Sequence, residues 1–421
     1  MNRYNSPQRR HDVYVTEIDD PDQARREMKR IGVHPYGIDI MAPKAVFRVV
    51  KVTGVSSCQA NVIKQEMLSI GADSANAAGC IDCSREESDI LLMGTIAQLG
   101  RLCSKLERQP PSFQHLSRNI KKALQDYDSE PKLKWELPGC DLECGSRTLI
   151  MGVVNVTPDS FSDGGAYFNH EAAAEHALRL EKEGADIVDI GGESTRPGSD
   201  PVSPEQEQER VLPVLENLKE KIRIPVSIDT KNASTAEQAV KRGAVIVNDV
   251  TALSGDDSMA RFCSEAGVGV VLMHMLGTPK TMQKNPEYED VVAEVGDYLE
   301  ERISAAREAG IPPERIVTDP GIGFGKTMEH NLALLRSTRE FISRFHRPLL
   351  IGVSRKRLIG ELTGKDVSER VFGTVGAVVT ASAGGGTIMR MHDVAACRDA
   401  LKVSDAIRSK GSTRIIKNRN D

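Results

Sequence analysis

Short apolar runs recur eight times from Thr148 onward, and each run ends in a polar cluster that precedes a longer amphipathic stretch. Near-continuous apolar runs that alternate with amphipathic helices are typical of a parallel sheet buried on both faces. Eight strand–helix units favour a closed (β/α)8 barrel, or TIM barrel, over an open sheet. The predicted strands span residues 148–154, 185–191, 225–230, 244–250, 268–274, 315–320, 348–354 and 387–393.

The residues before this repeat have a different pattern. Apolar runs predict strands over 45–53 and 89–95, and helical spacing predicts helices over 58–71 and 112–127. The expected fold class is therefore α/β, a TIM barrel preceded by a small α/β domain of unknown function. We expect a partly disordered N-terminal arm (1–43), the small domain (44–128), a Pro- and Gly-containing linker (129–146), the barrel (147–409) and a basic tail (410–421).

The amino-acid composition limits the kinds of molecule that the protein is expected to bind. The 421 residues include 55 Lys and Arg against 60 Asp and Glu, so the net charge of −5 gives no general reason to expect a nucleic acid or an anionic membrane as partner. No apolar run approaches the ~20 residues that span a bilayer. The polar N-terminus lacks the apolar core of a signal peptide, so we expect a cytoplasmic protein.

The cysteines are concentrated in the N-terminal part, where six of the eight precede Gly145. Cys80 and Cys83 have metal-ligand spacing, and Cys140 and Cys144 could complete four thiolates. A single CxxC is weak support for a metal site, because free cysteines are commonly small buried apolar residues. Both interpretations stay open.

The polar clusters fall at the C-terminal ends of the predicted strands, where TIM-barrel enzymes place their chemistry. In the loop 155–165, Asn155, Asp159 and Asp163 offer oxygen ligands for a metal, although a solvated turn would have a similar composition. The loop after the second strand contains Arg196, which could pair with an anion or face solvent.

The third and fourth predicted strands also end in polar residues. Asp229 ends one strand, and Asn248 with Asp249 ends the next. A carboxylate at the end of an apolar strand needs a partner, because burying it unpaired is costly. For Asp249 we favour a cap of the following helix, whereas structural and binding roles are equally open for the other two.

The last three strands are followed by loops suited to a flat, phosphorylated ligand. Segment 318–327 resembles a P-loop only superficially, because Pro320 stands where the first glycine is required. We expect its glycines to let Phe324 approach a flat ligand instead. Barrels often bind phosphate after strands seven and eight, and cationic residues gather there in this chain. These residues are Arg355, Lys356, Arg357, Arg390 and His392.

Together these motifs resemble the dihydropteroate synthase family of pterin-binding barrels from Thr148 to Ile407, in long segments and in the same order. A departure is Ile322, where the family often has Phe; it should alter packing more than chemistry. The motifs are MGVVNVTPDSFSDGG (151–165), GGESTRPG (191–198), SIDT (227–230), VNDV (247–250), MHMLGTPKTMQ (273–283), DPGIGFGK (319–326), GVSRK (352–356) and RMHDV (390–394).

The resemblance implies an enzyme that joins a (7,8-dihydropterin-6-yl)methyl diphosphate to 4-aminobenzoate, with Mg²⁺ as cofactor, sulfonamide sensitivity and a homodimeric assembly. It implies that the metal ligand is Asn155, with Asp163 in the same loop. The implied pterin residues are Asp229, Asn248, Met273, Asp319, Phe324 and Lys356. The implied diphosphate residues are Thr195, Arg390 and His392, and Met391 is implied as a further residue of the pterin diphosphate site. The implied 4-aminobenzoate residues are Phe161, Thr195, Arg196, Pro197, Phe324 and Ser354. Among these, Asn155, Asp163, Arg196, Lys356, Arg390 and His392 are the implied catalytic residues.

The chemistry of such substrates favours early breakage of the CH2–O bond, because the cation can delocalise into the pterin ring and nearby carboxylates stabilise it. We therefore expect an SN1-like displacement assisted by Mg²⁺. One alternative is a barrel that transfers a methyl group from a reduced folate to a corrinoid protein; another is a binding module without turnover. Because every motif follows Gly145, we expect residues 146–421 to fold and catalyse alone.

Overall fold

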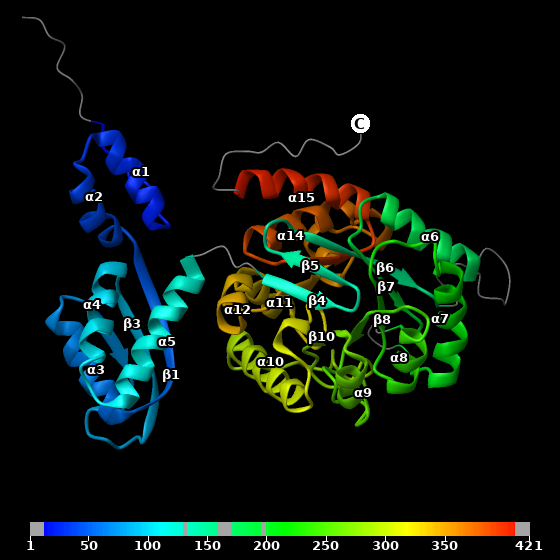
Figure 1. The fold of residues 1–421 in the computed structure, drawn as a ribbon, viewed down its shortest axis with the longest axis horizontal. Coiled ribbons are helices and arrows are strands. Elements are labelled where there is room, and N and C mark those ends of the chain that lie inside the picture. The colour runs from blue at the N-terminus through cyan, green and yellow to red at the C-terminus, as the bar shows by residue number, and fades with distance from the viewer. Residues whose placement is uncertain (1–11, 129–132, 158–169, 195–198, 200, 409–421) are drawn as a thin grey trace, which may run out of the picture. The chain divides into compact units, whose positions relative to one another are not determined.

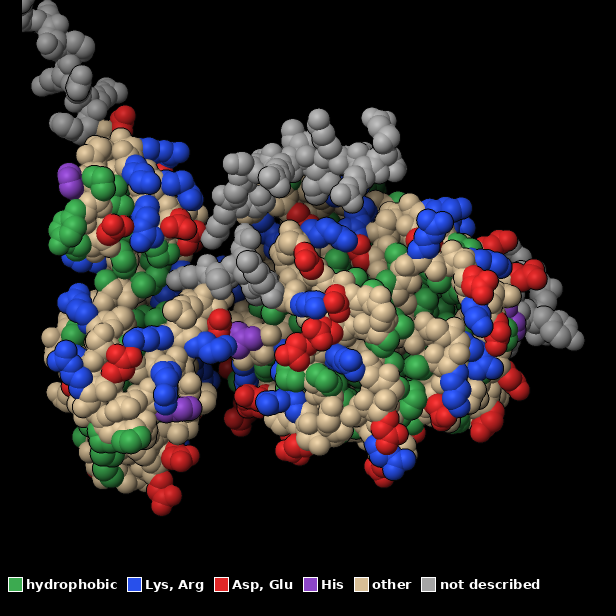
Figure 2. Space-filling view, in the orientation of Figure 1, with side chains coloured by type: hydrophobic (Ala, Val, Ile, Leu, Met, Phe, Trp, Pro, Cys, Tyr) green, Lys and Arg blue, Asp and Glu red, His purple; other side chains and the backbone are tan. Residues whose placement is uncertain are grey.

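The computed structural model describes residues 12–128, 133–157, 170–194, 199 and 201–408. Contacts divide the chain into two units, Met1–Ser129 and Glu130–Asp421. On the face shown in Figure 2, acidic and basic side chains are interspersed over each unit. Among the described residues, no helix has both the length and the apolar character needed to cross a membrane.

The first unit is a three-stranded antiparallel sheet with the strand order β1-β3-β2. Helices α3, α4 and α5 bury their apolar residues against one face of this sheet. This arrangement confirms the strands and helices expected between residues 45 and 127. The elements are α1 (Pro21–Ile31), α2 (Pro35–Met41), β1 (Phe47–Ser56), α3 (Ser57–Ser69), β2 (Asp73–Asn76), β3 (Glu87–Thr95), α4 (Ile96–Leu106) and α5 (Pro111–Asp128), with 3-10 turns at Ala42–Lys44 and Ala78–Cys80.

The expected N-terminal arm contains two helices. Helix α1 has strong end signals, because Asp20 accepts hydrogen bonds from the backbone of Asp22 and Gln23 and Gly32 ends the helix in the left-handed conformation. Its interior is weakly apolar, and Ala24 is its only buried residue. The arm prediction overlooked this helix because it gave weight to apolar spacing and not to the caps.

The second unit is the expected barrel. Eight parallel strands follow the order β11-β10-β9-β8-β7-β6-β13-β12, and a bridge between Thr318 and Leu349 joins the two ends of this order. Each strand lies within, or one residue from, a predicted run. The strands are β6 (Leu149–Asn155), β7 (Ile187–Gly191), β8 (Val226–Asp229), β9 (Ile246–Asp249), β10 (Gly269–Met273), β11 (Ile316–Asp319), β12 (Leu350–Gly352) and β13 (Ile388–Met391).

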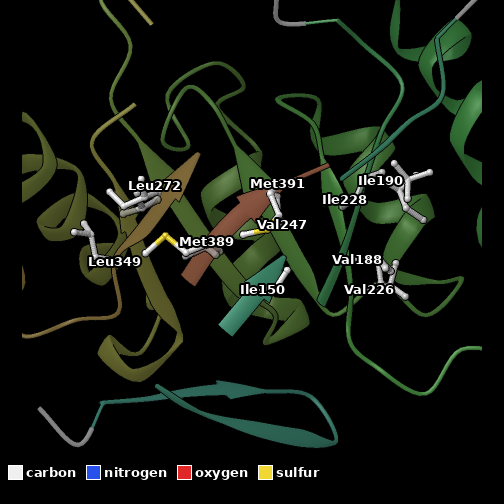
Figure 3. Close-up of a cluster of buried hydrophobic side chains, with 14 of the residues drawn as sticks. Ile150, Val188, Ile190, Val226, Ile228, Val247, Leu272, Leu349, Met389 and Met391 are labelled. Atoms are coloured by element: carbon white, nitrogen blue, oxygen red, sulfur yellow. The ribbon is translucent and has the colours of Figure 1, made fainter. Parts of the chain in front are cut away.

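Helices surround the strands and bury the main core between the two layers (Figures 1 and 3). The outward-facing residues of the strands, such as Ile150, Val188 and Ile228, belong to this core. The helices are α6 (His170–Lys182), α7 (Pro204–Leu218), α8 (Ala233–Val240), α9 (Met259–Ala266), α10 (Val291–Glu308), α11 (Met328–Arg336), α12 (Thr338–Phe345), α13 (Arg357–Thr363), α14 (Val371–Ala383) and α15 (Val394–Arg408), with 3-10 turns at Pro313–Arg315 and Val367–Glu369.

The expected linker 129–146 contains a β-hairpin that belongs to the barrel unit. Strands β4 (Leu133–Leu137) and β5 (Cys140–Cys144) pair antiparallel around Gly139, which has a φ of 79°. Apolar residues of the hairpin pack on inward-facing residues near the strand N-termini and form the floor of the barrel. This floor cluster comprises Trp135, Leu137, Cys144, Leu149, Met151, Ile187, Ile246, Val271, Val317, Leu350 and Ile388.

The fit of this hairpin is close. Trp135 is fully buried, and its indole N–H donates to the backbone oxygen of Arg315 over 3.0 Å. A Cβ atom on Gly269 would lie 2.3 Å from a Leu137 methyl carbon and 2.8 Å from the indole nitrogen of Trp135, so a larger residue there would have to displace these hairpin side chains. The linker interpretation was therefore wrong: of the prolines and glycines that suggested a linker, Pro138 and Gly139 form the hairpin turn.

Candidate functional site

Inward-facing side chains at the C-terminal ends of the strands form a buried charged cluster. Arg390 donates from Nε to Oδ2 of Asp189 and from Nη2 to Oδ2 of Asp229, each over 2.6 Å. Asn248 donates from Nδ2 to the same Asp189 oxygen over 3.1 Å. Strands β7, β8, β9 and β13 thus bring one cation, two carboxylates and one amide into contact.

This cluster contains fewer cations than carboxylates, because the single guanidinium of Arg390 pairs with both Asp189 and Asp229. Burial raises the pKa of Asp229 to about 7, although the Arg390 charge opposes the rise and the Asp189 charge adds to it. Near neutral pH, Asp229 can therefore exist with or without its proton. A ligand with N–H donors would favour the ionised form, since a carboxylate accepts hydrogen bonds.

A second group lies at the ends of β11 and β12. Oδ1 of Asp319 accepts a 2.7 Å hydrogen bond from the backbone N–H of Gly321, and burial raises the pKa of this carboxyl. Lys356 donates to the backbone oxygen of Ile322, and its Nζ lies 4.5 Å from the ring centre of Phe324. Burial lowers the pKa of Lys356 to about 8, against the opposing charge of Asp319.

The loop after β11 depends on glycine at a close approach. Gly321 has a φ of 67°, and a Cβ atom there would lie 1.9 Å from the backbone oxygen of His274. Lys326 is also buried in this loop, with its Nζ 2.9 Å from Nδ1 of His274 and 3.0 Å from the backbone oxygen of Phe324. Lys326 thus ties the end of β10 to the loop that positions Phe324.

A third group lies at the ends of β6, β12 and β13. Nδ2 of Asn155 lies 3.5 Å from Nε2 of His392, and Oγ of Ser354 lies 3.1 Å from Nδ1 of the same imidazole. The backbone N–H of His392 also donates to Ser354. The expected metal ligand, one expected diphosphate residue and one expected 4-aminobenzoate residue therefore meet at a single histidine.

Some expected site residues lie elsewhere. Met391 is fully buried among the residues that face the helices, because it alternates with the inward-facing Arg390 and His392 (Figure 3). Its expected contact with the pterin diphosphate is not supported by this position. Arg355 forms an ion pair with Asp393, in which Nε of Arg355 lies 2.9 Å from Oδ2 of Asp393.

Other expectations concern residues at the edge of the site. Met273 faces inward at the end of β10, beside Asp319 in the strand register. Asp249 has a structural role, but it accepts hydrogen bonds from Thr251 and Leu253 in the turn after β9 and does not cap α9. Six expected residues lie outside the described residues: Asp159, Phe161, Asp163, Thr195, Arg196 and Pro197.

Two buried groups were absent from the sequence prediction. Asp189 interrupts the apolar run of β7 at an inward-facing position, and this isolated acid was the available signal. Lys326 was considered only as part of a rejected P-loop, and its burial had no signal in the local pattern. Both residues hold other site residues in place.

The cysteines divide between the two units. Cys80 and Cys144 are buried, whereas Cys83 and Cys140 are exposed. Within the described residues, no group of three or more His, Cys, Asp or Glu side chains is arranged to hold a metal. Burial raises the pKa of Cys144 to about 12, as expected for an apolar environment in the barrel floor.

Comparisons with known proteins agree with this geometry. The profile of the pterin binding enzyme family matches residues 151–392. Dihydropteroate synthase of Neisseria meningitidis serogroup B is 52% identical over 62% of this chain and 93% of its own length. The structure of Xanthomonas albilineans dihydropteroate synthase with 4-aminobenzoic acid is 45% identical, with a TM-score of 0.62 over 67% of this chain and all of that chain.

One relative also extends over the first unit. A probable bifunctional folylpolyglutamate synthase/dihydropteroate synthase of Halobacterium salinarum is 39% identical over 94% of this chain, which corresponds to 47% of its own length. The family match covers more than half of the chain, and its borders enclose all three groups of site residues. The chain therefore belongs to the pterin-binding enzyme family.

Proposed function

We propose that the barrel is a dihydropteroate synthase, a transferase that condenses (7,8-dihydropterin-6-yl)methyl diphosphate with 4-aminobenzoate and releases diphosphate. The observation that carries the proposal is the convergence of Asp229, Asn248, Asp319 and Lys356 at one end of the barrel. A pterin has a fixed edge of N–H donors and acceptors, which carboxylates and an amide can match.

The three groups of side chains suit three parts of the reaction. Asp319 accepts paired N–H bonds from the aminopyrimidine part of the pterin, and Phe324 with Met273 packs on the ring. The buried carboxylates of Asp229 and Asp319 stabilise the cation that forms as the CH2–O bond breaks. His392, beside Asn155 and Ser354, faces the departing diphosphate and the incoming amine.

The breaking bond leaves its electron pair on the diphosphate oxygen, and the amine of 4-aminobenzoate then donates its lone pair to the methylene carbon. The amine nitrogen finally loses a proton. An arylamine is largely neutral at pH 7, so this sequence needs no strong general base. We therefore propose an SN1-like displacement, in which the rate of the first step depends little on the nucleophilicity of the amine.

The residues around His392 fit a magnesium ion that arrives with the diphosphate. Mg²⁺ takes one or two protein oxygens and completes its shell with phosphate and water. Asn155 turns Nδ2 toward His392 over 3.5 Å, which leaves its amide oxygen as a ligand. Bound there with the diphosphate, the ion would stabilise the charge of the leaving group.

We also propose that the barrel unit forms a homodimer through its last helices. Leu362 on α13, Phe372 on α14 and Val403 on α15 are large apolar residues that are more than half exposed. Apolar side chains exposed on adjacent helices are typical of subunit interfaces. Light scattering should find a dimer for the natural protein and a shift toward monomer for Phe372→Glu; a natural monomer would contradict this assembly.

The experiment that tests the function measures diphosphate release by the purified chain. Release should require the pterin diphosphate, 4-aminobenzoate and Mg²⁺ together, and sulfonamides should compete with 4-aminobenzoate and not with the pterin. A methyl transfer to a corrinoid protein would support the alternative barrel activity. Pterin binding without turnover would support a binding module instead.

A further inference from the structure

The proposed reaction gives no role to Asp189, although this residue lies at the centre of the charged cluster. Its side chain is fully buried, and Oδ2 accepts hydrogen bonds from both Arg390 and Asn248. Among the described residues, Oδ1 has no hydrogen-bond partner. The strand register pairs Asp189 with Ser227, two residues before Asp229, so Asp189 lies one inward-facing layer deeper in the barrel.

The contact with Asp189 determines the orientation of the Asn248 amide. A carboxylate paired with a guanidinium accepts hydrogen bonds and donates none, so the NH2 end of Asn248 must face Asp189. The opposite orientation would place two oxygen atoms in contact. The carbonyl oxygen and the second N–H of Asn248 are then left for a ligand.

We propose that Asp189 is a positioning residue that makes the pocket specific for the 7,8-dihydro state of the pterin, and that it acts through Asn248. A 7,8-dihydropterin has an N–H group at N8, whereas a fully oxidised pterin has a lone pair there. With its orientation fixed by Asp189, the carbonyl oxygen of Asn248 accepts a hydrogen bond from the N8–H of the dihydropterin. The same oxygen repels the lone pair on N8 of the oxidised pterin. This inference rests on the proposed function, which places the pterin beside Asn248.

The test compares two ligands that differ in oxidation state and lack diphosphate: 6-hydroxymethyl-7,8-dihydropterin and 6-hydroxymethylpterin. Calorimetry with the full chain should show that the dihydropterin binds at least about 10-fold more tightly, because it alone forms the hydrogen bond from N8–H to the buried oxygen of Asn248. Asp189→Asn should reduce this preference by about 10-fold, because an amide at position 189 can receive Asn248 in either orientation.

A matched set of variants separates this role from simple support of the fold. Asp189→Asn also loosens Arg390, but that change should affect both oxidation states alike and leave their ratio unaltered. In an Asn248→Ala background, Asp189→Asn should have no further effect on the ratio, because the residue through which it acts is gone. The KM for 4-aminobenzoate should stay unchanged in Asp189→Asn.

Measurements on the natural protein can overturn the inference by themselves, even if no variant folds. Equal affinity for the two pterins would show that the pocket does not distinguish their N8 positions. Equal weakening of both ligands by Asp189→Asn would reduce Asp189 to a structural role. A natural protein that binds neither pterin would overturn the proposed function itself, which is a separate and recognisable result.

Discussion

Arg390 and Asp229 are joined by a 2.6 Å contact between Nη2 and Oδ2. Under the proposed function, this contact places Arg390 beside the pterin, although the resemblance of its motif implied the diphosphate end. Asp189 accepts a hydrogen bond from Nε on the same edge of this guanidinium. The proposed pterin pocket and the proposed leaving-group site would then meet at Arg390, whereas His392 lies in the group with Asn155.

Replacement of Arg390 by Ala should weaken pterin binding with and without the diphosphate. The change leaves Asp189 and Asp229 as neighbouring unpaired carboxylates, and each lost charge-assisted hydrogen bond is worth about 1.5–3 kcal/mol. Calorimetry should thus show an affinity loss of at least about 10-fold for both ligands. A loss confined to the diphosphate-bearing pterin would contradict this placement. Arg390→Lys, which keeps the charge, should lose less.

His392→Ala should give the complementary result. The imidazole contacts Ser354 and Asn155, outside the group that surrounds Asp229. We expect kcat/KM to fall by roughly 10-fold, as for the loss of one charge-assisted bond to the leaving group. Pterin without diphosphate should bind as before. Asp319→Ala is the contrasting control, and equal behaviour of the two variants would place His392 in the pterin pocket.

The barrel was predictable because its strands are buried on both faces and read as apolar runs. The run at β7 predicted the strand, but an apolar run does not show which of its residues face inward, and Asp189 was overlooked for that reason. The alternation of side chains along a strand could have corrected the assignment of Met391 to the site. If Arg390 and His392 face the mouth, then Met391 between them must face the helices.

The remaining misses depended on tertiary contacts. The hairpin at Gly139 reads locally as a linker, and its role appears only when Trp135 and Leu137 meet the floor of the barrel. Likewise, Lys326 is buried because the backbone oxygens of His274 and Phe324 lie around it. A local sequence pattern does not predict contacts between segments that are distant in the chain.

Trp135→Ala should destabilise the barrel strongly without altering the site. The side chain is fully buried at the opposite end of the strands, and removing a large aromatic residue from a core costs about 3–5 kcal/mol. Thermal unfolding should show a clear drop in Tm, while kcat at low temperature stays close to normal. Lys134→Ala, an exposed change on the same strand, is the control. Equal Tm values would contradict the role of the hairpin.

Truncation should distinguish the two possible starts of the barrel. A chain of residues 130–421 keeps β4 and β5, and we expect it to be folded and active. A chain of residues 146–421 lacks the hairpin and exposes the floor cluster, so it should be less stable and prone to aggregation. Circular dichroism and solubility would compare them. Equal stability would restore our first expectation that the barrel begins near Gly145.

The pH dependence of pterin binding should follow Asp229. Its pKa is raised from 3.8 to about 7 by burial, so the carboxyl gains a proton as the pH falls through 7. Because the protonated group is neutral and is a weaker hydrogen-bond acceptor, affinity should fall by up to about 10-fold per pH unit below 7. Titrations of the dihydropterin between pH 5.5 and 8 would measure this. Asp229→Asn should bind weakly at every pH; an unchanged slope would assign the titration to another group.

The most direct test of the account is to identify and count the products of the natural chain and of Asp319→Ala. With dihydropterin diphosphate, 4-aminobenzoate and Mg²⁺, mass spectrometry should find one 7,8-dihydropteroate for each diphosphate released. The Asp319→Ala protein, if folded, should form far less of both, because a buried pterin contact is lost. Diphosphate without dihydropteroate, or undiminished product from Asp319→Ala, would contradict the assignment of this reaction to this site.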